Sequence, residues 1–262
     1  MTTALAALRA PLFVPATRPE RFAKAASSGA DAVILDLEDA VAPADKPAAR
    51  AALRADFTDL PVIVRINPAG TPWHAEDLSA AAAHPFAAVM LPKAESAAAV
   101  EAAAAATGLP VLALVETAHG LAAARRIAPA AARMVFGSID FCADLGCDPL
   151  PAVLDAARFE LVLAARLAAA PAPWDGVTAN LADPGAAAAD AAHARAMGMG
   201  GKLLIHPRQA APVRDAFRPS EAQVDWARRV LAAGDGTSQV DGEMVDEPVR
   251  LRARAILSAA EG

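Results

Sequence analysis

The sequence predicts an α/β protein built around a single parallel sheet. Short apolar runs recur along the 262 residues, and the segments between them are rich in alanine, the strongest helix former. Strands and helices that alternate in this way form a parallel sheet. Eight repeats favour a closed TIM (β/α)8 barrel over an open doubly wound sheet, followed by a short C-terminal helical extension.

Each of the eight segments is built around a short apolar run, which is typical of a strand that helices cover on both sides of a parallel sheet. No GxGxxG motif follows the first run, which argues against a dinucleotide-binding sheet. In chain order the predicted strands are LFVP (12–15), AVILDLED (32–39), VIVRIN (62–67), AVMLPK (88–93), VLALVE (111–116), RMVFGSID (133–140), WDGVTA (174–179) and KLLIHP (202–207).

The first helix is expected immediately after the first strand. Thr17 can cap it while Glu20 reaches back, with Pro19 inside the first turn, which makes a capping box.

The C-terminal end of the chain differs from the repeats. We expect the barrel to cover residues 1–210 and the extension residues 211–262, with helices near 220–233 and 247–260 and a loop, AGDGTSQVDGEMVD, between them. The extension is too short to fold as an independent domain, so we expect it to pack on a neighbouring subunit or on the barrel.

Composition narrows the class of protein. A hydrophobic content of 55% is ample for a large core, and a net charge of −6 without a long basic run argues against a nucleic-acid partner. No apolar run approaches the ~18 residues of a membrane span, and Arg9 interrupts any signal peptide. Cys142 and Cys147 lack CxxC spacing and are expected to be reduced thiols, so we expect a cytoplasmic protein.

Polar residues gather at the carboxyl ends of the predicted strands, where a barrel carries its functional groups. Glu116 and Asp140 end adjacent strands, and two carboxylates so close together need a proton or a cation between them. Oxygen ligands suit Mg²⁺, and no His/Cys cluster has zinc spacing. Taken singly, each acid could instead cap the next helix. The strand-end residues are Arg18, Asp36, Glu38, Asp39, Arg65, Asn67, Lys93, Glu116, Asp140, Asn180, Asp183 and His206.

Arg65 interrupts an apolar strand, and a buried guanidinium requires an anion. It either pairs with Asp36 or Glu38 or also binds a substrate carboxylate or enolate oxygen. Lys93 is interpreted as a surface or ion-paired lysine rather than a Schiff-base residue. His119 and His206 are each expected to be hydrogen-bonded core residues rather than catalytic bases.

An ordered set of motifs extends these predictions. FVPATRPERFAKA, VILDLEDAV, VRIN, LPK, ETAHG, FGSIDFCADLG, IHP and GEMVD span almost the whole chain, from Phe13 to Asp246. Together they resemble the citrate lyase β-subunit-like (CitE-like) family of the HpcH/HpaI aldolase superfamily. The resemblance implies a TIM barrel enzyme that uses Mg²⁺ (or Mn²⁺) to cleave a carbon–carbon bond of a 3-hydroxyacyl-CoA thioester such as citramalyl-, malyl- or citryl-CoA. The products would be acetyl-CoA and an α-keto acid.

The resemblance also implies roles for individual residues. Glu116 and Asp140 would be the metal ligands, with Glu116 also contacting substrate, and Arg65 would stabilise the enolate. Asp246 would transfer a proton after entering the site from a neighbouring subunit, which implies a homo-oligomer, with a trimer expected. The residues expected near the CoA phosphates are Arg18, Arg21 and Lys24, and those expected behind the metal ligands are Asp36, Glu38, Asp39 and Asn67.

Alternatives remain at this point. The basic trio could be a solvated helix face. The protein could be a malyl-CoA-type thioesterase, a non-catalytic subunit of a citrate-lyase-like complex, or an unrelated small-molecule barrel. The chain departs from similar proteins in having no tyrosine and a compact C-terminal region.

Overall fold

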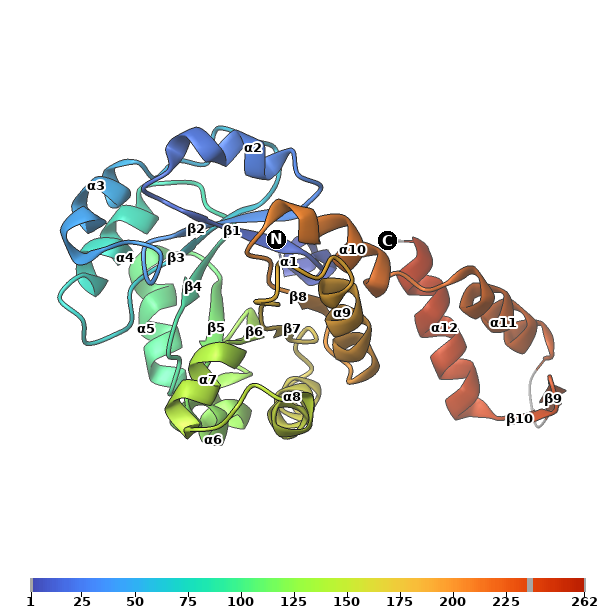
Figure 1. The fold of residues 1–262 in the computed structure, drawn as a ribbon. Helices are drawn as coiled ribbons and strands as arrows, with labels where there is room; N and C mark the ends of the chain where they lie inside the picture. Colours follow the sequence, from blue (N-terminus) through green and yellow to red (C-terminus); the bar gives the residue numbers. More distant parts are fainter. Residues whose placement is uncertain (1, 235–237, 262) are drawn as a thin grey trace. The chain divides into compact units, whose positions relative to one another are not determined.

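Eight parallel strands form one sheet in chain order in a computed structural model (Figure 1), which describes residues 2–234 and 238–261. The strands are β1 (Pro11–Pro15), β2 (Ala32–Asp36), β3 (Val62–Arg65), β4 (Ala88–Leu91), β5 (Val111–Val115), β6 (Arg133–Phe136), β7 (Trp174–Asp175) and β8 (Gly201–Lys202). Each of the eight strands overlaps the corresponding run predicted from the sequence.

The sheet curves back until its first and last strands meet. Leu12 and Leu204 form a parallel bridge, and the Phe13 amide donates to the Leu204 carbonyl at 2.9 Å. The predicted (β/α)8 barrel is therefore confirmed. Most strands are shorter at their carboxyl ends than predicted, because the polar residues there leave the sheet to form loops.

Within residues 1–214, helices connect the strands and surround the sheet (Figure 1). Two of them lie between β6 and β7, where the longest connection occurs. The helices are α1 (Thr2–Ala7), α2 (Phe22–Ala26), α3 (Lys46–Ala51), α4 (His74–Ala82), α5 (Ala97–Thr107), α6 (Ala118–Ile127), α7 (Ser138–Leu145), α8 (Pro151–Leu167), α9 (Ala186–Ala196), α10 (Ala210–Phe217), α11 (Glu221–Ala232) and α12 (Glu247–Glu261).

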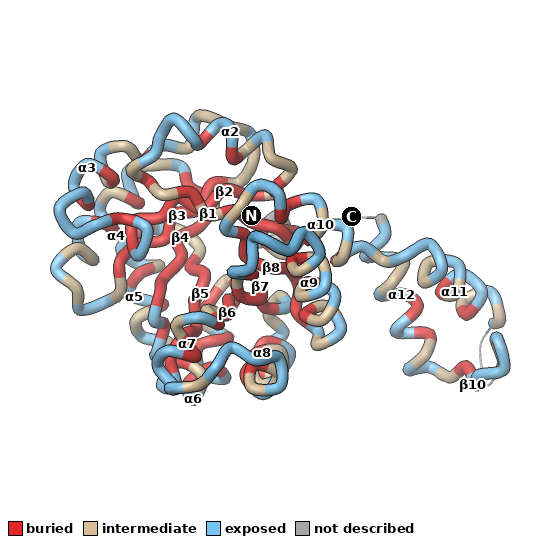
Figure 2. Tube along the Cα trace, viewed as in Figure 1, coloured by how far each residue is buried: buried red, intermediate tan, exposed pale blue. Residues whose placement is uncertain are grey.

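The strands carry the core, as the buried tube segments in Figure 2 show. Strands β2 to β5 are buried at every position, which explains why they are apolar apart from Asp36 and Arg65 at the ends of β2 and β3. One core cluster contains Leu5, Leu8, Ala32, Ile34, Ile63, Ala88, Met90, Leu112, Leu114, Val135, Trp174 and Leu203.

The helix α1, which the sequence did not predict, and the residue after it contact the amino-terminal ends of β6 and β7. Arg133 at the start of β6 donates to the carbonyls of Leu5 and Leu8 at 2.8 and 3.1 Å, and the Trp174 indole donates to Leu8 at 3.0 Å. The guanidinium also lies 4.8 Å from the centre of the Trp174 ring. Carbonyl oxygens thus solvate a buried cation.

The predicted capping box is wrong. The first helical turn is a 3₁₀ turn, η1 (Pro19–Arg21), whose N-cap is Arg18 without a side-chain cap. Glu20 instead pairs with the Arg18 guanidinium at 2.6 Å. The capping box does not form because the basic neighbour Arg18 competes for Glu20. The proline inside the first turn was predicted correctly.

A second buried ionic group fixes β7. Asp175 is fully buried and accepts from Arg158 of α8 at 2.9 Å and from Lys202 of β8 at 2.9 Å. Lys202 also donates to the Gly176 carbonyl at 2.7 Å. The opposing charges hold the shortest strands of the barrel to the helix outside them.

The chain divides into two compact units, Met1–Arg214 and Asp215–Gly262. In the second unit, α11 and α12 coincide with the two predicted helices and share a small core around Ala227, Val230 and Ala253. The connection between them, predicted as a loop, contains the antiparallel strands β9 (Ser238–Val240) and β10 (Glu243–Val245). Residues 235–237 of that prediction lie outside the described residues. No helix in the described ranges combines the length and apolar character that crossing a membrane requires.

Candidate active site

The loop after β2 folds back on the carboxylate that ends the strand. Asp36 Oδ1 accepts from the Glu38 amide at 2.9 Å, and Oδ2 accepts from the Ala40 amide at 3.1 Å. This turn brings Glu38 and Asp39 over the carboxyl end of the barrel, with Glu38 buried and Asp39 exposed.

Arg65 extends from β3 into this group of acids. Its Nε and Nη2 each donate to Asp36 at 2.7 Å, and Nη1 lies 3.0 Å from Glu38 and 3.2 Å from Asp39. Its guanidinium is 4.7 Å from the centre of the Phe13 ring. Burial alone would lower the pKa of Arg65, but the three carboxylates outweigh it and raise the pKa. The ion-paired alternative considered from the sequence is therefore observed, and it fixes the guanidinium in place.

Glu116 follows β5 and is buried, with 2% of its surface exposed. Its Oε1 accepts the Lys93 amide at 2.9 Å. Burial, together with the charge of Glu38, raises the pKa of Glu116 to about 8. The carboxylate packs against Gly137, where a Cβ atom would lie 2.4 Å from Glu116 Oε2. Gly137 thus leaves the space that Glu116 occupies.

Asp140 lies in the first turn of α7, directly after β6, and is half-buried. Together with Glu116 and Arg65 it lines a cavity of about 390 Å³ at the carboxyl ends of the strands. The other lining residues are Phe13, Asp36, Asp39, Ala40, Leu114, Phe136, Gly137, Ser138, Ile139, Val177, Leu203 and Ile205. The structure thus brings the two predicted metal ligands to one cavity.

The chemistry of this cavity fits a divalent cation. Burial raises the pKa of Glu38, because the loss of solvent disfavours its charged form. Glu38 Oε2 is buried without a hydrogen bond, although Arg65 Nη1 approaches to ion-pair distance. Over the described ranges, no three His, Cys, Asp or Glu side chains converge as a ligand set. Glu116 and Asp140 would thus provide two protein ligands, with water and substrate oxygens as the others, as Mg²⁺ prefers.

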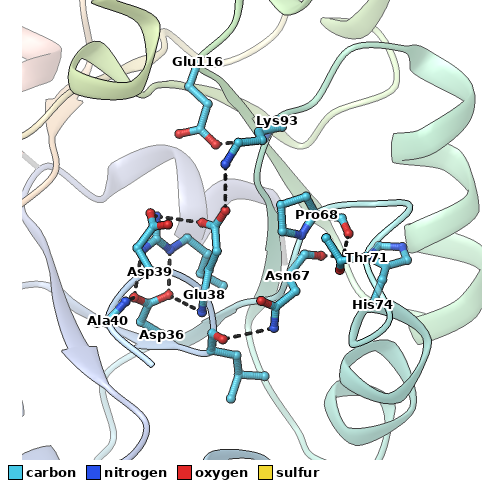
Figure 3. Close-up of polar contacts among 12 residues, drawn as sticks. Asp36, Glu38, Asp39, Ala40, Asn67, Pro68, Thr71, His74, Lys93 and Glu116 are labelled. Carbon is cyan, nitrogen blue, oxygen red and sulfur yellow. Dashed lines mark hydrogen bonds and ion pairs between the residues drawn. The ribbon is translucent and has the colours of Figure 1, made fainter. Parts of the chain in front are cut away.

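The loop after β2 that carries Glu38 and Asp39, here called the acidic loop, is shown in Figure 3. Two residues that the sequence did not single out support it. Lys46 is buried, and its Nζ donates to the carbonyls of Leu37 and Glu38 at 2.8 and 3.0 Å while facing the ring of Trp73. Asp77 is buried in α4. A lone lysine or aspartate inside a helical segment carries no local signal of such a role.

Asn67 lies behind the acidic loop, as part of the same support. Its Nδ2 donates to the Leu37 carbonyl at 3.0 Å and its amide donates to Asp77 at 2.8 Å. Asp77 in turn pairs with Arg50 at 3.0 Å. Asn67 therefore anchors the loop that carries Glu38.

The residues predicted to bind CoA phosphates, Arg18, Arg21 and Lys24, are all exposed. Glu20 pairs with Arg18 and lies 3.8 Å from Arg21. Their exposure is compatible with either alternative, phosphate binding or a solvated face.

Asp246 belongs to the second unit, where its Oδ1 accepts a hydrogen bond from the Val249 amide at 3.2 Å at the start of α12.

His119 is exposed on α6, so its prediction as a core residue is wrong. His206 is half-buried and caps a short 3₁₀ turn by accepting the Arg208 amide at 3.1 Å, as a hydrogen-bonding residue.

Comparison with known proteins agrees with this geometry. A family model described as HpcH/HpaI aldolase/citrate lyase matches residues 9–207. The chain is 44% identical over 265 residues to a citrate lyase subunit beta-like protein of Mycobacterium tuberculosis, covering 95% of this chain and 94% of that protein. It is 37% identical over 269 residues to a (3S)-malyl-CoA thioesterase of Cereibacter sphaeroides, covering 97% and 94%.

Among solved structures, CitE from Mycobacterium tuberculosis in complex with magnesium, acetoacetate and coenzyme A has a TM-score of 0.88 and 43% identity. The similarity covers 98% of this chain and 99% of that chain. The family match includes the whole sheet and every barrel residue of the acidic site. The chain belongs to the HpcH/HpaI aldolase/citrate lyase family, and it is similar to the citrate lyase β-subunit-like proteins that its motifs resemble.

Proposed function

We propose that the protein is a Mg²⁺-dependent carbon–carbon lyase that cleaves a 3-hydroxyacyl-CoA thioester into acetyl-CoA and an α-keto acid. One observation carries the proposal: Glu116 and Asp140 line the same cavity as the rigidly held guanidinium of Arg65. The similar CitE protein that binds magnesium, acetoacetate and coenzyme A supports it. Citramalyl-, malyl- and citryl-CoA are the substrates to be tested.

The reaction breaks the bond between the carbinol carbon and the α-carbon of the thioester. As the hydroxyl proton passes to solvent water, the carbinol carbon becomes the carbonyl of the keto acid, and the electrons of the broken carbon–carbon bond move onto the thioester as an enolate. Arg65, held by Asp36, is oriented to stabilise negative charge on the enolate oxygen. Glu116 and Asp140 would hold Mg²⁺, which when bound would act as a Lewis acid on the hydroxyl and carboxylate oxygens of the substrate. Asp246 of a neighbouring subunit would protonate the enolate carbon.

This proposal gives the remaining predicted residues a role. The exposed Arg18, Arg21 and Lys24 would meet the CoA phosphates at the rim of the barrel. A catalytic Asp246 supplied in trans requires a homo-oligomer, and a trimer is the form we propose. The hydrogen bond that Asp246 accepts from the Val249 amide would orient the Asp246 carboxylate at the start of α12.

A second candidate, a malyl-CoA-type thioesterase, is favoured by the similarity to the Cereibacter sphaeroides thioesterase. The same carboxylates would then orient a water molecule toward the thioester carbon, and the carbon–carbon bond would survive.

The test incubates the purified protein and Mg²⁺ with the three hydroxyacyl-CoA thioesters and identifies the products. Keto acid with acetyl-CoA means lyase, and hydroxy acid with free CoA means thioesterase. We expect Glu116→Gln and Asp140→Asn to lower keto-acid release at least 100-fold, in line with the loss of a metal ligand. Asp148→Asn, an exposed position after α7, is the matched control and should retain full activity. Full release by either ligand variant would refute the metal assignment, and no turnover without added partners would favour a non-catalytic subunit.

A further inference from the structure

Lys93 has a backbone conformation that lysine rarely adopts. It follows β4 and Pro92 with a φ of 47°, in the left-handed region. Among the described non-glycine residues, only Ala169 and Asp241 share a positive φ. An L-residue is disfavoured there because its Cβ crowds the following carbonyl, so the surroundings must hold it in place. Glycine would fit this turn more easily, which suggests that the side chain is needed.

This conformation lets one residue contact two buried acids, as Figure 3 shows. The Lys93 amide donates to Glu116 Oε1 at 2.9 Å, and its Nζ donates to Glu38 Oε1 at 3.1 Å. Glu116 comes from the end of β5 and Glu38 from the loop after β2. The backbone and the side chain of Lys93 therefore connect acids from two separate parts of the barrel.

The contact with the amide also decides which oxygen of Glu116 is available. Oε1 is engaged by Lys93, whereas Oε2 faces Gly137, where α7 begins. Asp140 lies three positions further along, in the first turn of that helix. Oε2 therefore lies at the start of the helix that carries Asp140, and it is the oxygen of Glu116 that the Lys93 amide leaves unengaged.

Charge alone does not explain the arrangement. Arg65 donates two hydrogen bonds to Asp36 and approaches Glu38 Oε2, whereas Lys93 donates to Glu38 Oε1, so Glu38 faces two cations. A cation beside a metal site repels the metal. If its charge were the whole role of Lys93, its removal would strengthen the binding of a dication.

We propose that Lys93 is a positioning residue, which holds Glu116 and Glu38 in the mutual orientation that a divalent cation requires. The inference rests on the proposed function. Lys93 does not line the cavity, so it acts through the two acids rather than on substrate. The ion pair with Glu38 favours the charged ammonium, which agrees with this role and not with an amine nucleophile.

The test measures the Kd of Mg²⁺ alone, without substrate, by calorimetry. Lys93→Arg keeps the cation, Lys93→Gly loses it but favours the left-handed turn, and Lys93→Met loses it while its side chain disfavours that turn. Without the Glu38 anchor the turn in Lys93→Met should relax and move the amide away from Glu116. We expect Lys93→Arg to stay within threefold of the wild type and Lys93→Met to bind Mg²⁺ at least tenfold more weakly, with Lys93→Gly between them. Arg166→Met, an exposed change of equal charge on α8, should leave Kd unchanged.

Binding by Lys93→Met that equals or exceeds that of the wild type would overturn the proposal and make Lys93 a simple counter-charge. Should Lys93→Met fail to fold, weaker binding by Lys93→Gly than by Lys93→Arg supports the proposal, and equal binding by the two refutes it. A wild-type protein that binds no Mg²⁺ would instead refute the metal site of the proposed function. The two failures are thus distinguishable.

Discussion

Gly137→Ala is a stringent test of the site, because it adds one methyl group at the contact between Glu116 and α7. Gly137 has a φ of −96°, so its backbone conformation does not require glycine. The new Cβ would lie 2.4 Å from Glu116 Oε2 and 2.5 Å from Glu116 Cβ. Rotation of the side chain can move the oxygen but not the Cβ atom, so either the end of β5 or the start of α7 must shift.

Overpacking of this kind costs about 1–3 kcal/mol, and we expect about 3 because the contacted atom belongs to a buried strand end. Urea denaturation gives the free energy of unfolding, and calorimetry gives the Kd for Mg²⁺. Displacement of Glu116 should weaken Mg²⁺ binding by at least tenfold, since the ligand no longer faces Asp140.

Gly146→Ala, at the other end of α7, is the matched control. Gly146 has a φ of +70° with no atom within 4 Å of an added Cβ, so alanine there adds only backbone strain of about 1–2 kcal/mol. It should leave Mg²⁺ affinity unchanged. A Gly137→Ala protein with the stability and Mg²⁺ affinity of the wild type would show that Glu116 does not pack against α7 as described.

Two further predictions concern buried charge. Burial beside Glu38 raises the pKa of Glu116 from 4.5 to about 8, so the folded metal-free protein keeps a proton that the unfolded chain releases between these values. Its stability in a chelator should fall as pH rises through this interval, by up to about 1.4 kcal/mol per pH unit. Glu116→Gln should remove that part of the slope of urea stability against pH; identical slopes would contradict the assignment. Asp175→Asn should destabilise the fold by about 3–5 kcal/mol, because Arg158 and Lys202 lose a buried counter-charge. The exposed Arg125→Ala should leave the urea midpoint nearly unchanged, and equal midpoints for these two variants would refute the reasoning.

The barrel could be predicted from sequence because its strands are buried on both sides. An unbroken apolar run such as VLALV identifies the core directly, and β5 contains these five residues. The ends of strands were harder to predict. Asp36 turns the chain out of the sheet by accepting two amides, so the residues after it form a loop although they continue the apolar pattern with Leu37.

The acids of the site could also be predicted, but their supports could not. Glu116 and Asp140 follow strands that are adjacent in sequence, so their proximity follows from the barrel topology alone. The left-handed turn at Lys93 and the buried ammonium of Lys46 depend on contacts with distant parts of the chain. The position of Gly137, between a strand and a helix that carries an acid, is visible in the sequence. That glycine is needed there to make room for Glu116 is visible only in the packing.

The segment before β1 is tied to the barrel through its carbonyl groups. Leu5 and Leu8 accept hydrogen bonds from Arg133, at the start of β6, and Leu8 accepts one from Trp174, at the start of β7. None of these four residues lines the cavity that Glu116 and Asp140 share. The groups that anchor the amino-terminal segment are therefore separate from the acids of the cavity, and a substitution can address one set without touching the other.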